Sequence, residues 1–322
     1  MKRSTSENIW LVIKYVSLIG FTILCIYPLV WLFLSSFKTN AELYTNTWGL
    51  PEQWSMTNYV NAVVKGGVFR YFGNSVIIAV SAVLVTVILA TMASYAIARM
   101  HWKLANLTHS IFLLGMMIPI YALVIPLFSI FKGMGLLDTH LAVIIPQIAV
   151  GFPMAIFIIC GFMRSIPTEL EEAAIIDGCT VFQCFFKIIL PIAKSSVVTV
   201  AVVQFINVWN DLLLPRIFLT DSSKMTLPVG LTNFQAMYST DYVGMIAAVI
   251  ITIIPSVVVY ILLHKQIMEG MVAGADGEWI YFDMVPEEHE VRTGAAEYTG
   301  RICVIGSKLD EHKLEELFGI TK

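Results

Sequence analysis

Apolar residues along this chain gather in long runs separated by short polar segments. A helix needs about 20 apolar residues to cross a lipid bilayer. Six runs meet that length, and they cover residues 10–34, 72–98, 107–131, 139–163, 190–214 and 244–263. Charged residues, Pro or Gly bound each run. The pattern predicts an all-α polytopic membrane protein with six transmembrane helices.

Several prolines fall inside these runs, namely Pro119, Pro126, Pro146, Pro153 and Pro255. A proline within a membrane helix frees a backbone carbonyl, which neighbouring helices or water must then satisfy. We therefore expect kinks at these positions. Several kinked helices in one bundle are more typical of a moving pathway than of a static membrane anchor.

Composition agrees with the membrane interpretation and marks a boundary near residue 275. The chain is 57% apolar and 13% charged, whereas soluble domains carry about 25% charged residues. Residues 276–322 hold 11 acidic and 5 basic groups, a net charge of −6, while the remainder has a net charge of +3. We expect a membrane domain over 1–275 and an acidic tail over 276–322. Within the tail, residues 278–285 and 300–307 predict strands and 309–319 predict a helix, which makes it a short α+β tail.

Basic residues give a weak indication of orientation. If the N-terminus lies inside, seven Lys and Arg residues fall on cytoplasmic segments and six on outer loops. The outer charges are spread over long loops, where the positive-inside rule counts least. We therefore expect both termini in the cytoplasm.

The segment from 164 to 190, here called the 164–190 loop, places carboxylates between two apolar runs. Pro167 suits a first helical position, and Thr168 followed three residues later by Glu171 predicts a capping box. Gly178 comes where the first short helix would end, in the left-handed conformation that glycine adopts at low cost. We expect two short helices joined at Gly178. With Glu172 and the small Ala173 and Ala174, they either form a docking surface for a basic partner or are solvated without one.

The spacing of this loop resembles a known motif. Glu172-Ala173-Ala174 is followed after three residues by Gly178, and nine residues later by Ile188-x-Leu190-Pro191. This resembles the coupling motif in permease subunits of binding-protein-dependent ABC importers. The segments "YFGNSVIIAVSAVLVTVILATMASYAIAR", "QFINVWNDLLLPRIFL", "KMTLPVGL" and "GMVAGA" resemble the maltose-permease branch, so the similarity covers about residues 8–275.

The resemblance implies a function and a set of partners. The chain would be the permease subunit of an ATP-driven carbohydrate importer in the cytoplasmic membrane, with the loop lodged in a cytoplasmic ATPase. The ATPase-coupling residues would be Glu172, Ala173, Ala174, Asp177, Gly178, Leu190 and Pro191. The partners would be two ATPase subunits, a second homologous permease and an extracytoplasmic solute-binding protein, with membrane lipid around them and no nucleic acid.

Polar residues at membrane depth are costly and therefore indicate function. The richest group lies near the end of the fifth run, where Gln204, Asn207 and Asp211 recur at helical spacing beside Asn210. These residues either line a substrate pathway or hold helices together. Asn74, Ser75 and Gln147 are weaker candidates, because a single amide in a bundle more often joins helices.

Other functions find less support in the sequence. No G-x-x-x-x-G-K-[ST] phosphate loop occurs, so we expect no enzyme activity and no cofactor in this chain, with ATP bound by partner subunits. The five cysteines have no disulfide or metal spacing. The tail resembles a fragment of the C-terminal domain of CobW-like GTPases, and we expect a passive fusion remnant. The alternative is a membrane-anchored sensor that signals through this tail.

Overall fold

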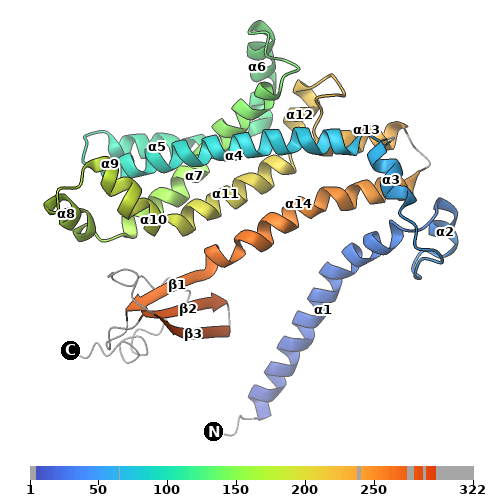
Figure 1. Ribbon diagram of the computed structural model, residues 1–322, viewed down its shortest axis with the longest axis horizontal. Coiled ribbons are helices and arrows are strands. Elements are labelled where there is room, and N and C mark those ends of the chain that lie inside the picture. The colour runs from blue at the N-terminus through green and yellow to red at the C-terminus, as the bar shows by residue number, and fades with distance from the viewer. Residues whose placement is uncertain (1–4, 65, 238–240, 274–278, 286–287, 295–322) are drawn as a thin grey trace. The chain divides into compact units, whose positions relative to one another are not determined.

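The computed structural model describes residues 5–64, 66–237, 241–273, 279–285 and 288–294 (Figure 1). The described chain is helical apart from one small sheet, which confirms the predicted all-α membrane fold. The expected strand over 300–307 and the expected helix over 309–319 lie outside the described residues.

Four helices have the length and hydropathy of a membrane span. They are α1 (Thr5–Ser35), α4 (Val68–Ala98), α7 (His140–Ser165) and α14 (Tyr242–Met268), with the apolar segments of α1 and α14 covering Ile13–Ser35 and Tyr242–Leu262. They correspond to the first, second, fourth and sixth predicted spans.

The third and fifth predicted spans are bent pairs of helices rather than single rods. α5 (Ala105–Gly115) and α6 (Ile120–Gly133) meet at 94°, and Pro119 stands directly before α6. The second pair meets at 72° at Ala193, between residues 181–192 and α11 (Lys194–Trp209). The expected kink at Pro119 is thus a full break, since proline is disfavoured in a helix interior and restricts the residue before it.

Shorter helices lie between the spans or, over residues 181–192, form the first arm of the second bent pair. They are α2 (Asn40–Thr45), α3 (Thr57–Val64), α8 (Glu169–Ile176), α9 (Val181–Cys184), the π-helix η1 (Phe185–Ile189), α10 (Leu190–Ile192), α12 (Leu213–Phe218) and α13 (Leu227–Met237).

The sheet is antiparallel with the order β1 (Glu269–Ala273), β2 (Trp279–Val285), β3 (Glu288–Gly294). Glu269 pairs with Asp283 across β1 and β2, and Trp279 pairs with Gly294 across β2 and β3. β2 confirms the strand predicted over 278–285. The predicted domain boundary near residue 275 falls between β1 and β2.

The chain divides into two compact units. The first contains residues 1–77, 137–140 and 210–256, and the second contains 78–136, 141–209 and 257–322. The main buried cluster of the second unit is formed by α4, α7, α9, η1 and α11, with Ile156, Ile159, Met163, Phe185 and Ile189 almost fully buried.

Asp138 joins two loops within the first unit. Its backbone has a φ of 60°, and its N–H donates to the Phe218 carbonyl at 2.8 Å. Its Oδ1 accepts from the backbone N–H groups of Thr220 and Asp221, each at 2.9 Å, while Oδ2 lies 3.0 Å from Lys224 Nζ. This single carboxylate therefore fixes the 218–224 segment against the turn before α7.

Candidate functional site

The 164–190 loop contains two short helices joined at Gly178, as the sequence predicts. α8 ends at Ile176, Asp177 is its C-cap, and Gly178 follows with a φ of 84°. The N–H of Cys179 donates to the Ala174 carbonyl at 2.9 Å, and the N–H of Gly178 donates to the Ile175 carbonyl at 3.0 Å. These two bonds form a Schellman motif, which requires the left-handed residue that glycine provides. The turn that starts the second helix is therefore set by local sequence.

The predicted capping box at Thr168 is wrong. Thr168 has helical backbone angles, φ −70° and ψ −27°, and its side chain accepts no capping hydrogen bond. A capping residue needs an extended backbone to aim its oxygen at the first N–H groups. The box forms instead at the start of α9, where the Thr180 hydroxyl accepts from the Gln183 N–H and the Gln183 side chain accepts from the Thr180 N–H.

Glu171 has a different role, because it binds Arg99 at the end of α4. Arg99 Nε lies 2.5 Å from Glu171 Oε2, and the Arg99 side chain is only 3% exposed. The same guanidinium donates to three backbone carbonyls that lead into α8, those of Met163 at 3.2 Å, Ile166 at 2.7 Å and Pro167 at 3.3 Å. Arg99 therefore anchors the start of the loop to α4. Sequence reasoning missed this pair, although an arginine just after an apolar span and a glutamate in the first turn of the loop were its available signals.

A buried apolar contact supports the same anchor. The rings of Tyr95 on α4 and Phe185 on η1 lie 5.0 Å apart. Cys184 and Ile189 are buried in the same cluster. Ala174 also belongs to this cluster and is 5% exposed. Ala174 thus differs from its expected role, because it packs inside this chain and offers no surface to a partner.

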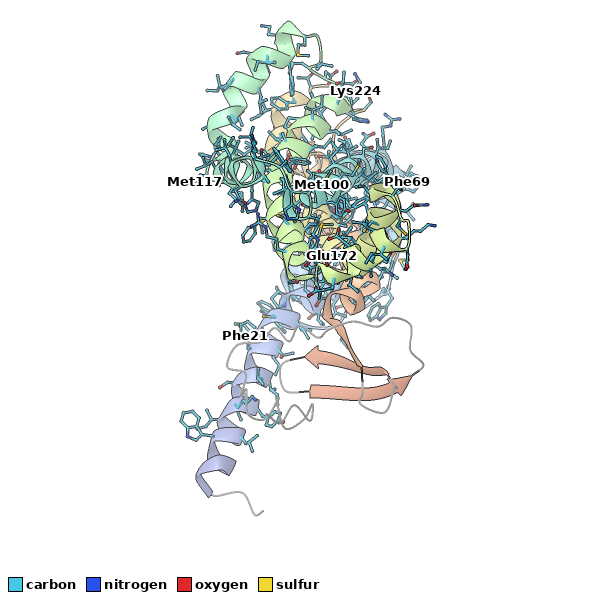
Figure 2. The ribbon with its side chains drawn as sticks, turned by 90° about the vertical axis from the view of Figure 1, so that its left-hand side faces the viewer. Phe21, Phe69, Met100, Met117, Glu172 and Lys224 are labelled. Carbon is cyan, nitrogen blue, oxygen red and sulfur yellow. The ribbon has the colours of Figure 1, made fainter. Side chains whose placement is uncertain are left out.

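The opposite side of the loop is exposed and largely apolar. Glu172, Ala173, Asp177 and Gly178 lie on the surface. Ile176 is 85% exposed and Phe182 is 71% exposed, and Ile175, Val181 and Phe186 are also exposed. Figure 2 looks onto this end of the second unit, with Glu172 in front. Clustered exposed apolar side chains beside polar ones are typical of a protein interaction site.

Leu190 and Pro191 have a different position from the rest of the predicted coupling set. They form α10 directly after the π-helix, where Leu190 is half-buried and Pro191 is exposed. The 72° bend follows at Ala193. These two residues stand where the loop turns into α11.

Gln204 on α11 is buried and binds the helix facing it. Its Nε2 donates to the Gln147 carbonyl on α7 at 2.9 Å. A Cβ at Gly151 would overlap the Gln204 amide, so glycine is what allows the two helices to approach here. A small cavity of about 150 Å³ opens beside this contact, and Asn207, which is exposed, lines it together with Gln147 and Gln204.

The expectation that Asp211 shares a helical face with Gln204 and Asn207 is wrong. α11 ends at Trp209, so Asn210 and Asp211 lie beyond the helix, and the fifth span stops short of the predicted residue 214. Asp211 Oδ1 accepts from the N–H of Leu213 at 3.0 Å. A side chain that binds the backbone two residues ahead competes with helix continuation. Asp211 thus helps to start α12.

Asn74 and Ser75 bind backbone within the first unit. Asn74 Nδ2 donates to the carbonyls of Ser223 and Met225, each at 2.9 Å. Ser75 Oγ accepts from the N–H of Leu227 at 2.8 Å. Both side chains therefore hold the segment before α13 against α4. Among the described residues, no group of three or more His, Cys, Asp or Glu side chains is placed to hold a metal ion.

Residues 82–266 match the family described as "Binding-protein-dependent transport system inner membrane component". The chain is 36% identical to "Putative ABC transporter permease protein ORF2" of Caldicellulosiruptor sp. (strain Rt8B.4), over 81% of this chain and 95% of that protein. It is 32% identical to "Diacetylchitobiose uptake system permease protein NgcG" of Streptomyces coelicolor, over 84% of this chain and 90% of the relative.

Two further similarities agree with this match. The "Arabinooligosaccharides transport system permease protein AraQ" of Halalkalibacterium halodurans is 33% identical, over 85% of this chain and 99% of that protein. A chain from the crystal structure of a bacterial ABC transporter involved in the import of the acidic polysaccharide alginate has a similar fold. It superimposes with a TM-score of 0.70 at 23% identity, and the match covers 82% of this chain and 99% of that chain.

Proposed function

Because this chain belongs to the family of binding-protein-dependent transport system inner membrane components, we propose that it is the permease subunit of an ATP-driven importer for a carbohydrate. Relatives that align over most of their length take up diacetylchitobiose and arabinooligosaccharides by name, which favours an oligosaccharide as the solute. The sensor alternative finds no counterpart among these relatives. The permease itself carries out no catalysis and holds no cofactor.

The geometry of the 164–190 loop carries the coupling proposal. One side of the loop is fixed to α4 by Arg99 and by the Tyr95–Phe185 contact. The other side exposes Glu172, Ala173 and a set of large apolar side chains. An element that is rigidly anchored on one side and exposed on the other transmits the movement of a docked partner to the helix that anchors it. The partner is a cytoplasmic ATP-binding subunit, and two such subunits serve the importer.

Six residues of the loop contribute to this coupling in different ways. Glu172 offers a carboxylate to a basic group of the ATPase, and Ala173 allows close approach. Asp177 and Gly178 form the turn at the exposed end, while Leu190 and Pro191 join the loop to α11. Placing this surface in the cytoplasm puts both termini there as well. A second permease and an extracytoplasmic solute-binding protein complete the importer.

The solute pathway runs past the polar contact between α7 and α11. The cavity beside Gln204 and Asn207 holds amide groups that are able to bind hydroxyls. Asn210 and Asp211, beyond the end of α11, remain further candidates for contact with the solute. The acidic tail over 276–322 is a passive appendage in this proposal.

Affinity purification of the tagged chain, expressed with its neighbouring genes and extracted in mild detergent, tests the assignment. We expect an ATPase and a second permease to come with it. The double variant Glu172→Lys/Gly178→Val should lose the ATPase and keep the second permease, which shows that the variant still folds. The control Glu52→Lys/Gly161→Ala changes an exposed carboxylate outside the loop and a glycine whose added Cβ meets no atom. Recovery of the chain alone, or undiminished ATPase with the loop variant, would refute the proposal.

A further inference from the structure

A second cavity of about 530 Å³ lies at the end of α4, where the chain turns into α5. Its polar lining comes from the 99–106 segment and from the last turn of α7, and consists of Arg99, His101, Trp102, Lys103, Asn106 and Arg164. This volume falls within the range of small-ligand sites. The cavity is wide open to the surface, and of its lining only Arg99 has a part in the proposed coupling.

The cavity is basic and its lining contains no carboxylate. Lys103 and Arg164 are both exposed, and within the described ranges neither forms an ion pair or a hydrogen bond through its side chain. Arg99 is already neutralised by Glu171. Two cationic side chains therefore face the same space without a counter-charge, which is the chemistry of an anion site.

The first turn of α5 adds donors to the same space. α5 begins at Ala105, and the residue before it, Leu104, supplies no side-chain cap. Ala105 and Asn106 both line the cavity, and because the Ala105 N–H already donates to the Trp102 carbonyl at 3.2 Å, Asn106 supplies the backbone donor. The N-terminus of an 11-residue helix carries a partial positive charge and backbone N–H groups without helical partners. This charge reinforces the two side chains.

The surroundings of the cavity are those of a membrane surface. It lies between the end of one span and the start of the next, since α4 ends at Ala98 and α5 begins at Ala105. Trp102 donates from Nε1 to the Ala96 carbonyl at 2.8 Å, which fixes its partly exposed ring at the end of α4. Met100 and Leu104 beside it are 46% and 56% exposed. Tryptophan and snorkelling basic residues are typical of the boundary between acyl chains and headgroups.

From these observations we propose that the cavity binds the phosphate of an anionic phospholipid headgroup. Lys103 and Arg164 pair with the phosphate, the first turn of α5 donates to it, and the acyl chains run past Met100 and Leu104. Basic pockets between membrane helices are known to take such headgroups. Figure 1 shows the junction of α4 and α5 at the same end of the second unit as α8.

The bound lipid would also steady the 164–190 loop, a step that rests on the proposed coupling function. Arg164 precedes Ile166 by two residues, and the Ile166 carbonyl is one of the acceptors of Arg99. A lipid held by Arg164 therefore restrains the segment that Arg99 anchors.

Native mass spectrometry of the purified complex tests the lipid site directly. The complex is reconstituted in vesicles of phosphatidylcholine and phosphatidylglycerol and then extracted. Its mass is measured together with the lipid that it retains. We expect Lys103→Gln/Arg164→Gln to lower retained phosphatidylglycerol about tenfold or more, since each basic group near an anionic surface adds to the attraction. The control Arg70→Gln/Lys132→Gln removes two exposed basic groups elsewhere, one of them at the opposite end of α4, and should retain the lipid.

Three outcomes would overturn the proposal. Equal phosphatidylglycerol on the pocket variant and the control would show that the cavity holds no headgroup. Displacement of the lipid by millimolar inorganic phosphate would assign the site to a soluble anion. Loss of the ATPase subunits with lipid unchanged would make the cavity a protein contact. Because the readout is retained lipid, failure here leaves the transport assignment standing, and failure of that assignment leaves the lipid measurement intact.

Discussion

Glu171 and Glu172 are neighbours in the sequence and have opposite surroundings. Glu171 lies against the buried guanidinium of Arg99, with its side chain 14% exposed, whereas Glu172 is exposed on the outer side of α8. One carboxylate therefore contributes to the position of the loop, and the other is available to a partner. Substitutions at the two positions should separate these effects.

Arg99→Gln should loosen the 164–190 loop. It leaves Glu171 without its cation and three carbonyls without a donor, and breaking a buried pair in this way costs about 3–5 kcal/mol. Hydrogen exchange of the purified complex should show the loss of protection in α8. Arg99→Gln/Glu171→Gln should recover part of it, because no uncompensated charge remains. Glu172→Gln serves as the control. In the chain separated from its ATPase it should leave exchange in α8 unchanged, whereas in the complex it should weaken retention of the ATPase.

Gly178→Ala should impair coupling through backbone strain alone. The φ of 84° disfavours any residue with a Cβ by about 1–2 kcal/mol, although no atom lies within 4 Å of the added carbon. Gly161→Ala is the matched control, since its Cβ also meets no atom and its backbone is helical, where alanine is favoured by about 0.5–1 kcal/mol. Solute-stimulated ATP hydrolysis of the complex should fall for the first variant only. Equal activity of both variants would show that the turn does not matter for coupling.

Asp138 should make stability depend on pH in the acid range. Hydrogen bonds from the Asp221 N–H and from Lys224 lower the pKa of Asp138 to about 2. An unfolded aspartate has a pKa of about 3.9. The stabilisation is therefore complete above about pH 4 and is lost as the pH falls toward 2. Asp138→Asn keeps an acceptor oxygen and tolerates the left-handed backbone, so its thermal midpoint should vary less between these pH values. An unchanged pH profile would contradict the role of this carboxylate.

At the scale of elements, the contact between α7 and α11 depends on one small residue and one amide. Gly151→Ala should displace the Gln204 side chain and break its bond to the Gln147 carbonyl. Such bonds within membrane bundles contribute about 0.6 kcal/mol on average. We therefore expect a small loss of thermal stability from Gly151→Ala and a similar loss from Gln204→Leu.

Transport kinetics then separate the two roles of Gln204. If the amide only joins the helices, both variants should change stability and leave the KM for uptake unaltered. If it also contacts solute, Gln204→Leu should raise the KM beyond the effect of Gly151→Ala. Asn207→Leu is the companion variant, because Asn207 lines the cavity without the bond to α7.

At the scale of the whole molecule, the membrane domain should support transport without the acidic tail. A chain that stops after Ala275 keeps every residue matched to the family, because that match ends at residue 266. We expect it to assemble with its ATPase and to support solute uptake at close to the full rate. Abolished uptake with normal assembly would favour the sensor role for residues 276–322.

Local sequence determined the elements and much of the loop. The apolar runs predicted six spans, since hydropathy and length depend only on neighbouring residues. The turn at Gly178 could be predicted because glycine adopts the left-handed backbone conformation at low cost. The capping box was predicted at Thr168-x-x-Glu171 but forms at Thr180-x-x-Gln183, because only Thr180 has the extended backbone that a cap requires.

Tertiary structure decided which side chains meet. Arg99 and Glu171 are 72 positions apart, and their pairing depends on how α4 and the loop pack. The same packing buries Ala174 and exposes Ala173, although the two residues are identical in type. α11 ends at Trp209, where the Leu213 N–H donates to the Asp211 carboxylate in a bond that competes with further helix. Sequence thus determined where apolar helices form, because burial in lipid follows composition. The anchored and exposed sides of the loop were set by contacts between distant segments, which no local pattern contains.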